Sequence, residues 1–220
     1  SIPRCSNCTD DQCVGATEIL ATSAENEAFY ECTSLESVTM SNNVTSIGSY
    51  AFSGCTRLTS VIIPDSVTSI GNYAFVYCES LTSVIIPNSV ISIRSNPFPA
   101  CLSLTSISVE PGNQHFLDDN GILFSKDETT IVSYPTGKSD SIYRIPINVR
   151  TIGNAAFGDC SNLTSVIIPD SVTSIEGHAF FNCSNLKSVI IDIDSNVTSI
   201  GNSAFQNCSS LTNVSISENV

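Results

Sequence analysis

The residues of this chain that could do nucleophilic or metal chemistry are ten cysteines, two histidines and one short acidic run. A nucleophilic triad needs a histidine beside a serine or cysteine, with an acid that orients it. Neither His115 nor His178 lies in a motif of this kind. His178 takes the place that Tyr50 and Tyr73 hold in similar segments, so we expect it to face solvent. We expect no catalytic residue and no enzymatic activity.

The acidic run, Asp192-x-Asp194-x-Asn196, begins like a calcium-binding loop. An EF-hand loop has Gly at its sixth position and Glu at its twelfth, where this chain has Val197 and Ser203. A two-residue lengthening of one repeated segment explains the run adequately. We expect no metal site and no cofactor.

The cysteines fall into two sets that need different explanations. Cys5, Cys8 and Cys13 crowd the N-terminus, where a disulfide is the favoured interpretation. Free thiols and a metal site are the alternatives, although a closed zinc site would lack its fourth ligand. The others recur every 23 or 25 residues with one gap of 59, and we expect reduced thiols that fill an inner column of the core as small apolar side chains. They are Cys32, Cys55, Cys78, Cys101, Cys160, Cys183 and Cys208.

The regular cysteines end a repeated segment. "TRLTSVIIPDSVTSIGNYAFVYC" (56–78) is followed at once by "ESLTSVIIPNSVISIRSNPFPAC" (79–101), and self-similarity at such a period is typical of a solenoid. The apolar-x-apolar run before proline predicts a short strand. The spacing from Ile70 through Phe75 to Cys78 predicts a short helical or 3₁₀ segment. Stacked copies would bury the unchanged letters as core columns, because paired strands lie ~4.8 Å apart.

The pattern L-x-x-V-x-I-P-x-x-V-x-x-I-x-x-x-A-F-x-x-C resembles the BspA-type (Treponema-type) leucine-rich repeat of microbial and protist surface proteins. The resemblance covers about residues 25–109 and 142–220. It implies an α/β-type repeat solenoid, a right-handed arc with short strands on its concave face and helical turns elsewhere. In one copy Pro97 and Pro99 flank Phe98, so we expect irregular chain in place of its helical turn.

One interruption separates the two runs of repeats. The stretch "DDNGILFSKDETTIVSYP" predicts strands at about 121–125 and 130–134 joined by a polar turn. We interpret about residues 111–141 as an inserted β-hairpin, for which a structural role and a ligand-contacting loop both fit. The predicted division is an N-terminal cap, residues 1–24, and a solenoid, residues 25–220, that carries the hairpin.

The strand segments predict one exposed row of side chains. Val61 and Ile63 would point inward and leave Ile62 outside. Contiguous exposed apolar surface often marks a binding site, whereas β-propensity and lateral packing of isoleucines are the alternative explanation. The candidate binding residues on the concave strand face are Thr39, Ile62, Ile85, Ser108, Ile167, Ile190 and Ser215.

Composition excludes some partners. Eight Lys and Arg against 21 Asp and Glu give a net charge of −13, which argues against nucleic acid and anionic membrane. No apolar run approaches the ~20 residues of a spanning helix, so we expect no direct membrane insertion. Because the chain begins at Ser1 without a signal sequence, we expect a trimmed or mature form. Val214 and Ile216 would lie on an uncovered strand edge, which predicts self-association or a longer array.

The resemblance implies a secreted or cell-surface binding module, extracellular in location. Its expected partner is a protein or glycan ligand on host, matrix or neighbouring cells, and adhesion would use the repeat surface. The alternative is a structural or assembly domain of a larger surface protein. A third hypothesis, binding to ice or mineral, rests on a threonine row that Ile91 and Arg150 interrupt. The row consists of Thr45, Thr68, Thr173 and Thr198.

Overall fold

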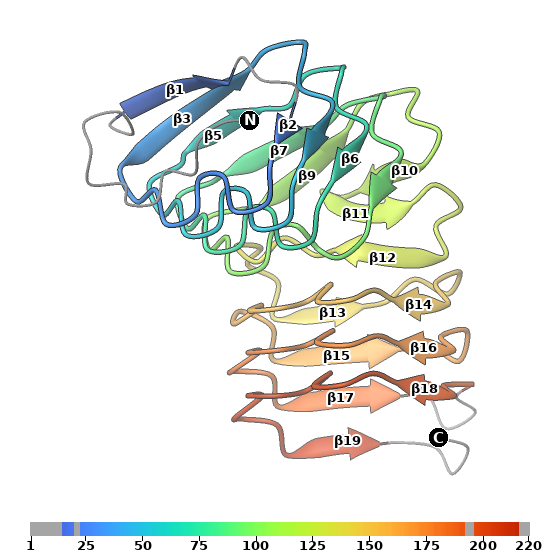
Figure 1. The fold of residues 1–220 in the computed structure, drawn as a ribbon. Helices are drawn as coiled ribbons and strands as arrows, with labels where there is room; N and C mark the ends of the chain where they lie inside the picture. Colours follow the sequence, from blue (N-terminus) through green and yellow to red (C-terminus); the bar gives the residue numbers. More distant parts are fainter. Residues whose placement is uncertain (1–14, 20–22, 192–195, 216–220) are drawn as a thin grey trace.

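The protein is a β-solenoid. The computed structural model describes residues 15–19, 23–191 and 196–215, and every regular element in these ranges is a strand. Each repeat, here called a rung, contributes one longer and one short strand, and most strands pair in parallel with their counterparts in the next rung (Figure 1). The longer strands are β1 (Gly15–Ile19), β3 (Leu35–Met40), β5 (Ser60–Ile62), β7 (Ser83–Ile86), β9 (Ser106–Val109), β13 (Ile142–Arg144), β15 (Ser165–Ile168), β17 (Ser188–Ile191) and β19 (Asn213–Ser215). The short row comprises β2 (Ser23–Ala24), β4 (Ser46–Ile47), β6 (Ser69–Ile70), β8 (Ser92–Ile93), β12 (Thr130–Ser133), β14 (Thr151–Ile152), β16 (Ser174–Ile175) and β18 (Ser199–Ile200).

Alternate residues of the longer strands are core positions, as predicted. In β7 Val84 and Ile86 are buried, whereas Ser83 and Ile85 are exposed, which is the alternation of a strand with one face in the core. The register between β15 and β17 advances by one repeat, so each residue lies beside its own counterpart. Like therefore packs on like between these two rungs.

The segment that precedes each cysteine, here called the turn segment, is not helical, so the prediction of helical or 3₁₀ turns was wrong. Tyr73 and Tyr77 have φ angles of 55° and 61°, in the left-handed region that a right-handed helix excludes. Alternate N–H groups also leave the segment. The Phe52 N–H, for example, donates to the Ala74 carbonyl of the next rung at 2.8 Å. A helix would need these donors for itself, and hydrogen bonding between rungs takes them.

The proline-rich copy keeps its place in the core. Phe98 is buried and stacks on Phe75, with ring centroids 5.4 Å apart. The carbonyls of Pro97 and Pro99 accept hydrogen bonds from the Phe75 and Tyr77 N–H groups of the preceding rung. The prolines lack only N–H groups that in an earlier rung, at Ala51 and Ser53, donate within the turn segment itself.

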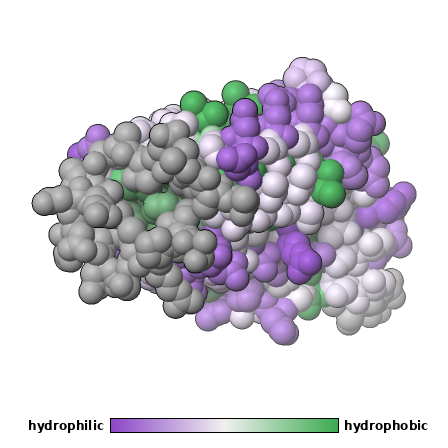
Figure 2. All heavy atoms as spheres, turned by 45° about the horizontal axis from the view of Figure 1, so that its top comes forward, coloured by the Kyte–Doolittle hydropathy of each residue, from purple (hydrophilic) through white to green (hydrophobic). Residues whose placement is uncertain are grey.

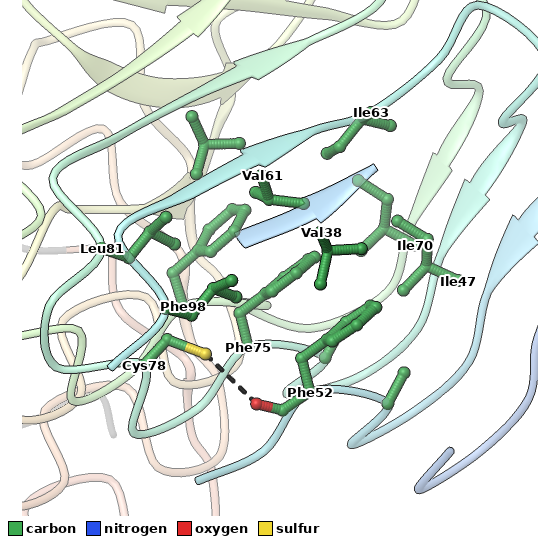
Figure 3. Packing of buried hydrophobic residues seen from close by; sticks show 14 of the residues in the cluster. Val38, Ile47, Phe52, Val61, Ile63, Ile70, Phe75, Cys78, Leu81 and Phe98 are labelled. Atoms are coloured by element: carbon green, nitrogen blue, oxygen red, sulfur yellow. Dashed lines mark hydrogen bonds between the residues drawn. The ribbon is translucent and has the colours of Figure 1, made fainter. Parts of the chain in front are cut away.

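Aromatic rings form two separate stacks in the core. Neighbouring centroids within a stack lie 4.9 to 5.4 Å apart, and Figure 3 shows three of the rings lying one over another. The apolar core divides in the same way into two clusters. The N-terminal stack contains Phe29, Phe52, Phe75 and Phe98, and the C-terminal stack contains Tyr134, Phe157, Phe180 and Phe205.

The periodic cysteines are mostly buried thiols, but two expectations need correction. Cys32 is disulfide-bonded, so it does not belong to the column of reduced thiols. The others are not only apolar filler, because the Cys78 Sγ donates to the Phe52 carbonyl at 3.2 Å (Figure 3). Burial raises the pKa of the Cys78 and Cys101 thiols, which keeps them protonated and unreactive. Free thiols are found at Cys78, Cys101, Cys160, Cys183 and Cys208, and the N-terminal trio lies outside the described residues.

The carbonyl partner sets the expected effect of a substitution at Cys78. We expect Cys78→Ser to cost about 1 kcal/mol or less in free energy of unfolding, because its hydroxyl can donate to the same Phe52 carbonyl. Cys78→Ala should cost about 1–2 kcal/mol, because it loses that bond and leaves a small void. Urea unfolding of both variants measures the difference. A Ser variant less stable than the Ala variant would show that the bond contributes nothing.

Serine and threonine hydroxyls link the rungs on the outside of the core. The Thr68 Oγ1 donates to the Thr45 carbonyl at 3.2 Å, and the Thr173 Oγ1 donates to the Arg150 carbonyl at 3.2 Å. Similar bonds recur one repeat apart along other columns. The polar composition thus stabilises the solenoid.

The interruption contains the two predicted strands and one more. β11 (Ile122–Ser125) pairs antiparallel with β12, and β10 (Phe116–Asp119) adds to its other side. β12 also pairs in parallel with β14, so the second strand of the predicted hairpin is part of a rung. Asn113 anchors the start of the insertion, because its Nδ2 donates to the Pro87 and Val90 carbonyls. The proposed domain boundaries stay predictions, since residues 1–14 and 20–22 lie outside the described residues.

The rung that contains β12 has a shortened turn segment. Two residues separate Ile131 from Tyr134, whereas four separate Ile152 from Phe157 in the next rung. Ile131 nevertheless pairs with Ile152, and Tyr134 stacks on Phe157 at 5.1 Å. The shortened rung therefore leaves part of its edge of the solenoid unfilled.

The two stacks meet at this gap. The Asn96 N–H donates to the Asn154 carbonyl at 3.1 Å, and the Asn96 Nδ2 donates to the Ala155 carbonyl at 2.8 Å. Asn96 belongs to the N-terminal stack and Asn154 to the C-terminal stack, two rungs further on. Figure 1 shows the consequence: β3 to β9 run obliquely across the upper part, whereas β13 to β19 form a column in the lower part.

The last described strand, β19, pairs with β17 on one side. Val214 lies in this strand, and Ile216 lies outside the described residues. Self-association through this edge stays a prediction. We expect the sedimentation coefficient to rise with protein concentration, because a strand edge that no other described strand pairs with can add another strand. A constant monomeric value over the whole concentration range would contradict it.

Candidate functional site

The predicted row of exposed side chains is present on the longer strands. Ile62, Ile85 and Ile190 expose 67%, 57% and 45% of their surfaces, and Ile167 is half-buried. Thr39 and Ser108 are exposed, and the Ser215 side chain lies outside the described part. Among the residues that Figure 2 colours, most on the face in view are hydrophilic or intermediate, and hydrophobic residues form a few separate patches.

The structure divides this row into two isoleucine pairs. In the N-terminal stack Thr39 pairs with Ile62, and Ile85 pairs with Ser108, with β5 and β7 in contact between them. In the C-terminal stack Ile167 lies between Arg144 and Ile190, and Ser215 follows. Arg144 was not predicted as a member of the row, because the insertion obscures the repeat pattern in the rung that contains it. Placement of the row on a concave face stays a prediction.

The second pair borders a shallow apolar hollow. The hollow measures about 480 Å³ and lies over the ends of β13, β15 and β17. Ile147, the most exposed isoleucine of the described residues, lines it together with Ile167 and Ile190. Arg144 is the one charged side chain in its lining. An apolar hollow with a single basic group at its wall can receive an apolar side chain of a partner.

A second surface was not predicted and lies where the two stacks meet. It is a groove of about 490 Å³, here called the tyrosine groove. Four of the six tyrosines of the chain line it. Its aromatic residues are Tyr30, Tyr50, Tyr73, Tyr77, His178 and Phe181, and its acidic residues are Glu31 and Asp159.

The lining of the tyrosine groove follows the repeat. Every lining residue is the one before the Ala, the one after the Phe, or the one before the Cys of its turn segment. Tyr50 and Tyr73 hold the first position, Tyr30 the second and Tyr77 the third. The clustering of tyrosines at three repeat positions is a signal that the sequence contained. What it did not reveal is that the two stacks bring these positions together.

Specific contacts hold the two walls of the groove. The Tyr73 Oη donates to the Asn154 Oδ1 at 2.7 Å, which joins the N-terminal and C-terminal stacks. Tyr50 stacks on Tyr73 with centroids 5.4 Å apart, and His178 meets Phe181 edge-on at 5.7 Å. His178 is half-buried in the groove wall, so it faces solvent only in part. His115 is exposed in the insertion, far along the chain from it.

The Tyr73–Asn154 hydrogen bond shows that the solenoid changes direction between its two stacks. Tyr73 lies in the third aromatic rung and Asn154 in the sixth, and three rungs at ~4.8 Å each would separate them by about 14 Å. If the rungs were stacked in a straight line, a tyrosine and an asparagine side chain could not bridge this distance. The shortened rung lets the turn segments approach, and the groove forms between them.

The tyrosine groove contains acidic side chains, and one of them, Asp159, is partly shielded from water. Burial raises the pKa of Asp159, and the hydrogen bond from Asn182 to its Oδ1, 3.0 Å long, opposes this rise. Burial and the nearby Asp159 charge raise the pKa of Tyr77. Tyr77 therefore stays neutral at physiological pH, and a cation beside Asp159 would stabilise the charged form of that carboxyl group.

A metal-binding cluster does not occur in the part of the chain that the structure describes, and none of its elements is a helix long enough to cross a membrane. Asp192 and Asp194 of the calcium-like run lie outside the described residues. The Asn196 Nδ2, which is described, donates to the Asp170 carbonyl of the neighbouring repeat at 2.9 Å.

Parallel rungs, stacked phenylalanines and proline-ended strands define a leucine-rich-repeat type of β-solenoid. The chain belongs to the BspA-type leucine-rich repeat family, whose family model matches residues 21–126 and 134–220 in six copies. Curated proteins offer no significant match.

Solved structures of bacterial leucine-rich-repeat proteins share the fold. A leucine-rich repeat protein from Eubacterium ventriosum is 26% identical with a TM-score of 0.67, and the alignment covers 91% of this chain and 66% of that one. The pneumococcal vaccine antigen PcpA is 23% identical with a TM-score of 0.69, covering 93% of this chain and 62% of that one. The chain thus spans less than two thirds of each of these relatives.

Proposed function

We propose that the protein is a secreted or cell-surface binding module that adheres to a protein or glycan ligand on host, matrix or neighbouring cells. The observation that supports this most is the pair of isoleucines on each stack, of which Ile62, Ile85 and Ile190 are exposed and Ile167 is half-buried. Ile62 and Ile85 leave more than half of their surfaces in water on strands whose other exposed residues next to them are Ser and Thr. Apolar surface of this kind gains free energy when a partner covers it, by about 25 cal/mol per Å².

The hollow beside Ile167 and Ile190 supports the same proposal. It gives a partner side chain a concave apolar contact, which a flat row of isoleucines would not. Its Arg144 wall favours an acidic group next to the inserted apolar one. A location outside the cell agrees with the family resemblance and with the pneumococcal vaccine antigen of the same fold. We propose that the protein is not an enzyme.

The alternative is a structural or assembly domain without a ligand of its own. The observation that favours it is the extent of lateral bonding, because hydroxyl and backbone bonds link every described rung to its neighbours. The exposed isoleucines would then only favour strand formation, because isoleucine has a high β-propensity.

A binding screen separates the two functions. The isolated chain would be tested against cultured cells, matrix proteins and a glycan array, with a chain in which Ile62, Ile85, Ile167 and Ile190 are replaced by Thr as the matched control. Saturable binding that the control loses supports the binding module. Equal, weak signals for both chains on every surface would favour the assembly domain.

A further inference from the structure

The tyrosine groove has the composition of a site for a positively charged group. Aromatic faces attract cations through their quadrupoles, and carboxylates attract them through charge. The groove has both: four tyrosines, with Asp159 half-buried and Glu31 exposed. No Lys or Arg lines it, so neither carboxylate has a basic neighbour within the groove.

The fold does not need tyrosine at these positions. Tyr50, Tyr73 and Tyr77 have φ angles of 56°, 55° and 61°, where a bulky side chain costs roughly 1–2 kcal/mol relative to glycine. The position of Tyr77 is occupied by Gly54 in the preceding rung and by Asn182 in a later one. Large aromatic rings are therefore retained where smaller residues satisfy the backbone better.

We propose that the tyrosine groove binds a lysine or arginine side chain from an exposed basic segment of a protein partner. The charge balance of the whole chain supports this choice, since a net charge of −13 attracts basic partners over some distance. The inference does not rest on the isoleucine pairs, because the groove is built from the turn segments and not from the longer strands.

The site should recognise charge and shape together. A cation between the rings of Tyr73 and Tyr77 would also approach the Asp159 carboxylate, whose partial burial strengthens the attraction. Because protonation removes this charge, affinity should fall as pH is lowered through the Asp159 pKa, which lies above its ordinary value. Affinity should also fall as salt is added.

The test uses the full chain and the peptide acetyl-Gly-Gly-Lys-Gly-Gly-amide, with its Arg counterpart. The matched neutral probes contain acetyl-lysine or citrulline. Titration calorimetry gives the dissociation constant, and tyrosine fluorescence reports the site, because the chain has no Trp and four of its six tyrosines line the groove. We expect saturable binding of the cationic peptides at about 1 mM or tighter. The neutral peptides should bind about tenfold more weakly or worse.

Variants locate the site and test it against folding. Tyr77→Gly and Asp159→Asn should each weaken binding about fivefold or more. The melting temperature of the Tyr77→Gly variant should be equal or higher, because glycine relieves the left-handed strain. Asp65→Asn, which removes an exposed charge elsewhere, is the control and should bind normally.

Three results would each overturn the proposal. They are equal binding of neutral and cationic peptides, absence of saturation up to about 20 mM, and normal binding by Tyr77→Gly. Capture of a neutral oligosaccharide that depends on Tyr77 would also overturn it and assign the groove to a glycan. Loss of the isoleucine pairs should leave peptide binding unchanged, so failure here and failure of the proposed adhesion surface are separable.

Discussion

Replacing Phe75 by Ala is expected to lower the free energy of unfolding by about 3–5 kcal/mol. The Phe75 ring is fully buried and stacks between Phe52 and Phe98, at 5.1 and 5.4 Å. Its removal opens a cavity in the middle of a stack where each rung contacts only its neighbours. Denaturant unfolding followed by circular dichroism measures the loss, and we also expect a broader transition as coupling across the stack weakens.

Phe205→Ala is the matched control for this prediction. Phe205 holds the same position in its turn segment, but it is half-buried and stacks on one ring only, Phe180, at 5.3 Å. We expect a cost of about 1–2 kcal/mol, because less apolar surface is lost and the site can relax into solvent. Equal costs at the two positions would show that rung position does not govern the energetics of this solenoid.

The second large effect concerns binding. Replacing Ile62 and Ile85 together by Lys should abolish binding of any partner that uses this face, because apolar contact is replaced by unpaired charge. The stability of the variant should change by less than about 1 kcal/mol, since both side chains lie largely in water. Binding of the natural partner and thermal melting, measured on the same preparation, test both parts.

Two further variants make the result specific. Ile91→Lys introduces the same charge at an exposed isoleucine outside the row and should bind normally. Lys126→Ala combined with Glu128→Gly alters the loop between β11 and β12. It keeps the left-handed turn at residue 128, where φ is 58°. Loss of binding in this loop variant but not in the double Lys variant would move the contact to the insertion. Unfolding of the double Lys variant would show that the strand faces are assigned wrongly.

Much of the core could be predicted because it repeats. A residue such as Val61 or Phe75 recurs at one spacing, and burial of unchanged positions against their own copies follows from the parallel stacking of short strands. The strands of the insertion were equally visible from local alternation and a polar turn. The conformation of the turn segments could not be predicted in this way. The residue spacing typical of a short helix also occurs in a segment whose N–H groups donate to the next rung.

Other features were hidden for related reasons. The periodic spacing of Cys32 gives no sign that it is disulfide-bonded. Tyr134 occupies a phenylalanine position, but its turn segment is two residues short, so the repeat pattern could not be recognised there. Arg144 joined the isoleucine row only when β13 was found beside β15.

The sequence by itself determined the family, the rung, the core columns and the exposed isoleucines, because each depends on one repeat and its immediate copies. Only the tertiary structure decided that the solenoid changes direction between its two stacks and that tyrosines from separate rungs line one groove. The hydrogen bond between Tyr73 and Asn154 joins residues 81 apart in the chain. This bond can form because an intervening rung is two residues shorter than the others. The spacing of residues within one repeat does not show that the shortening brings the turn segments of distant rungs together.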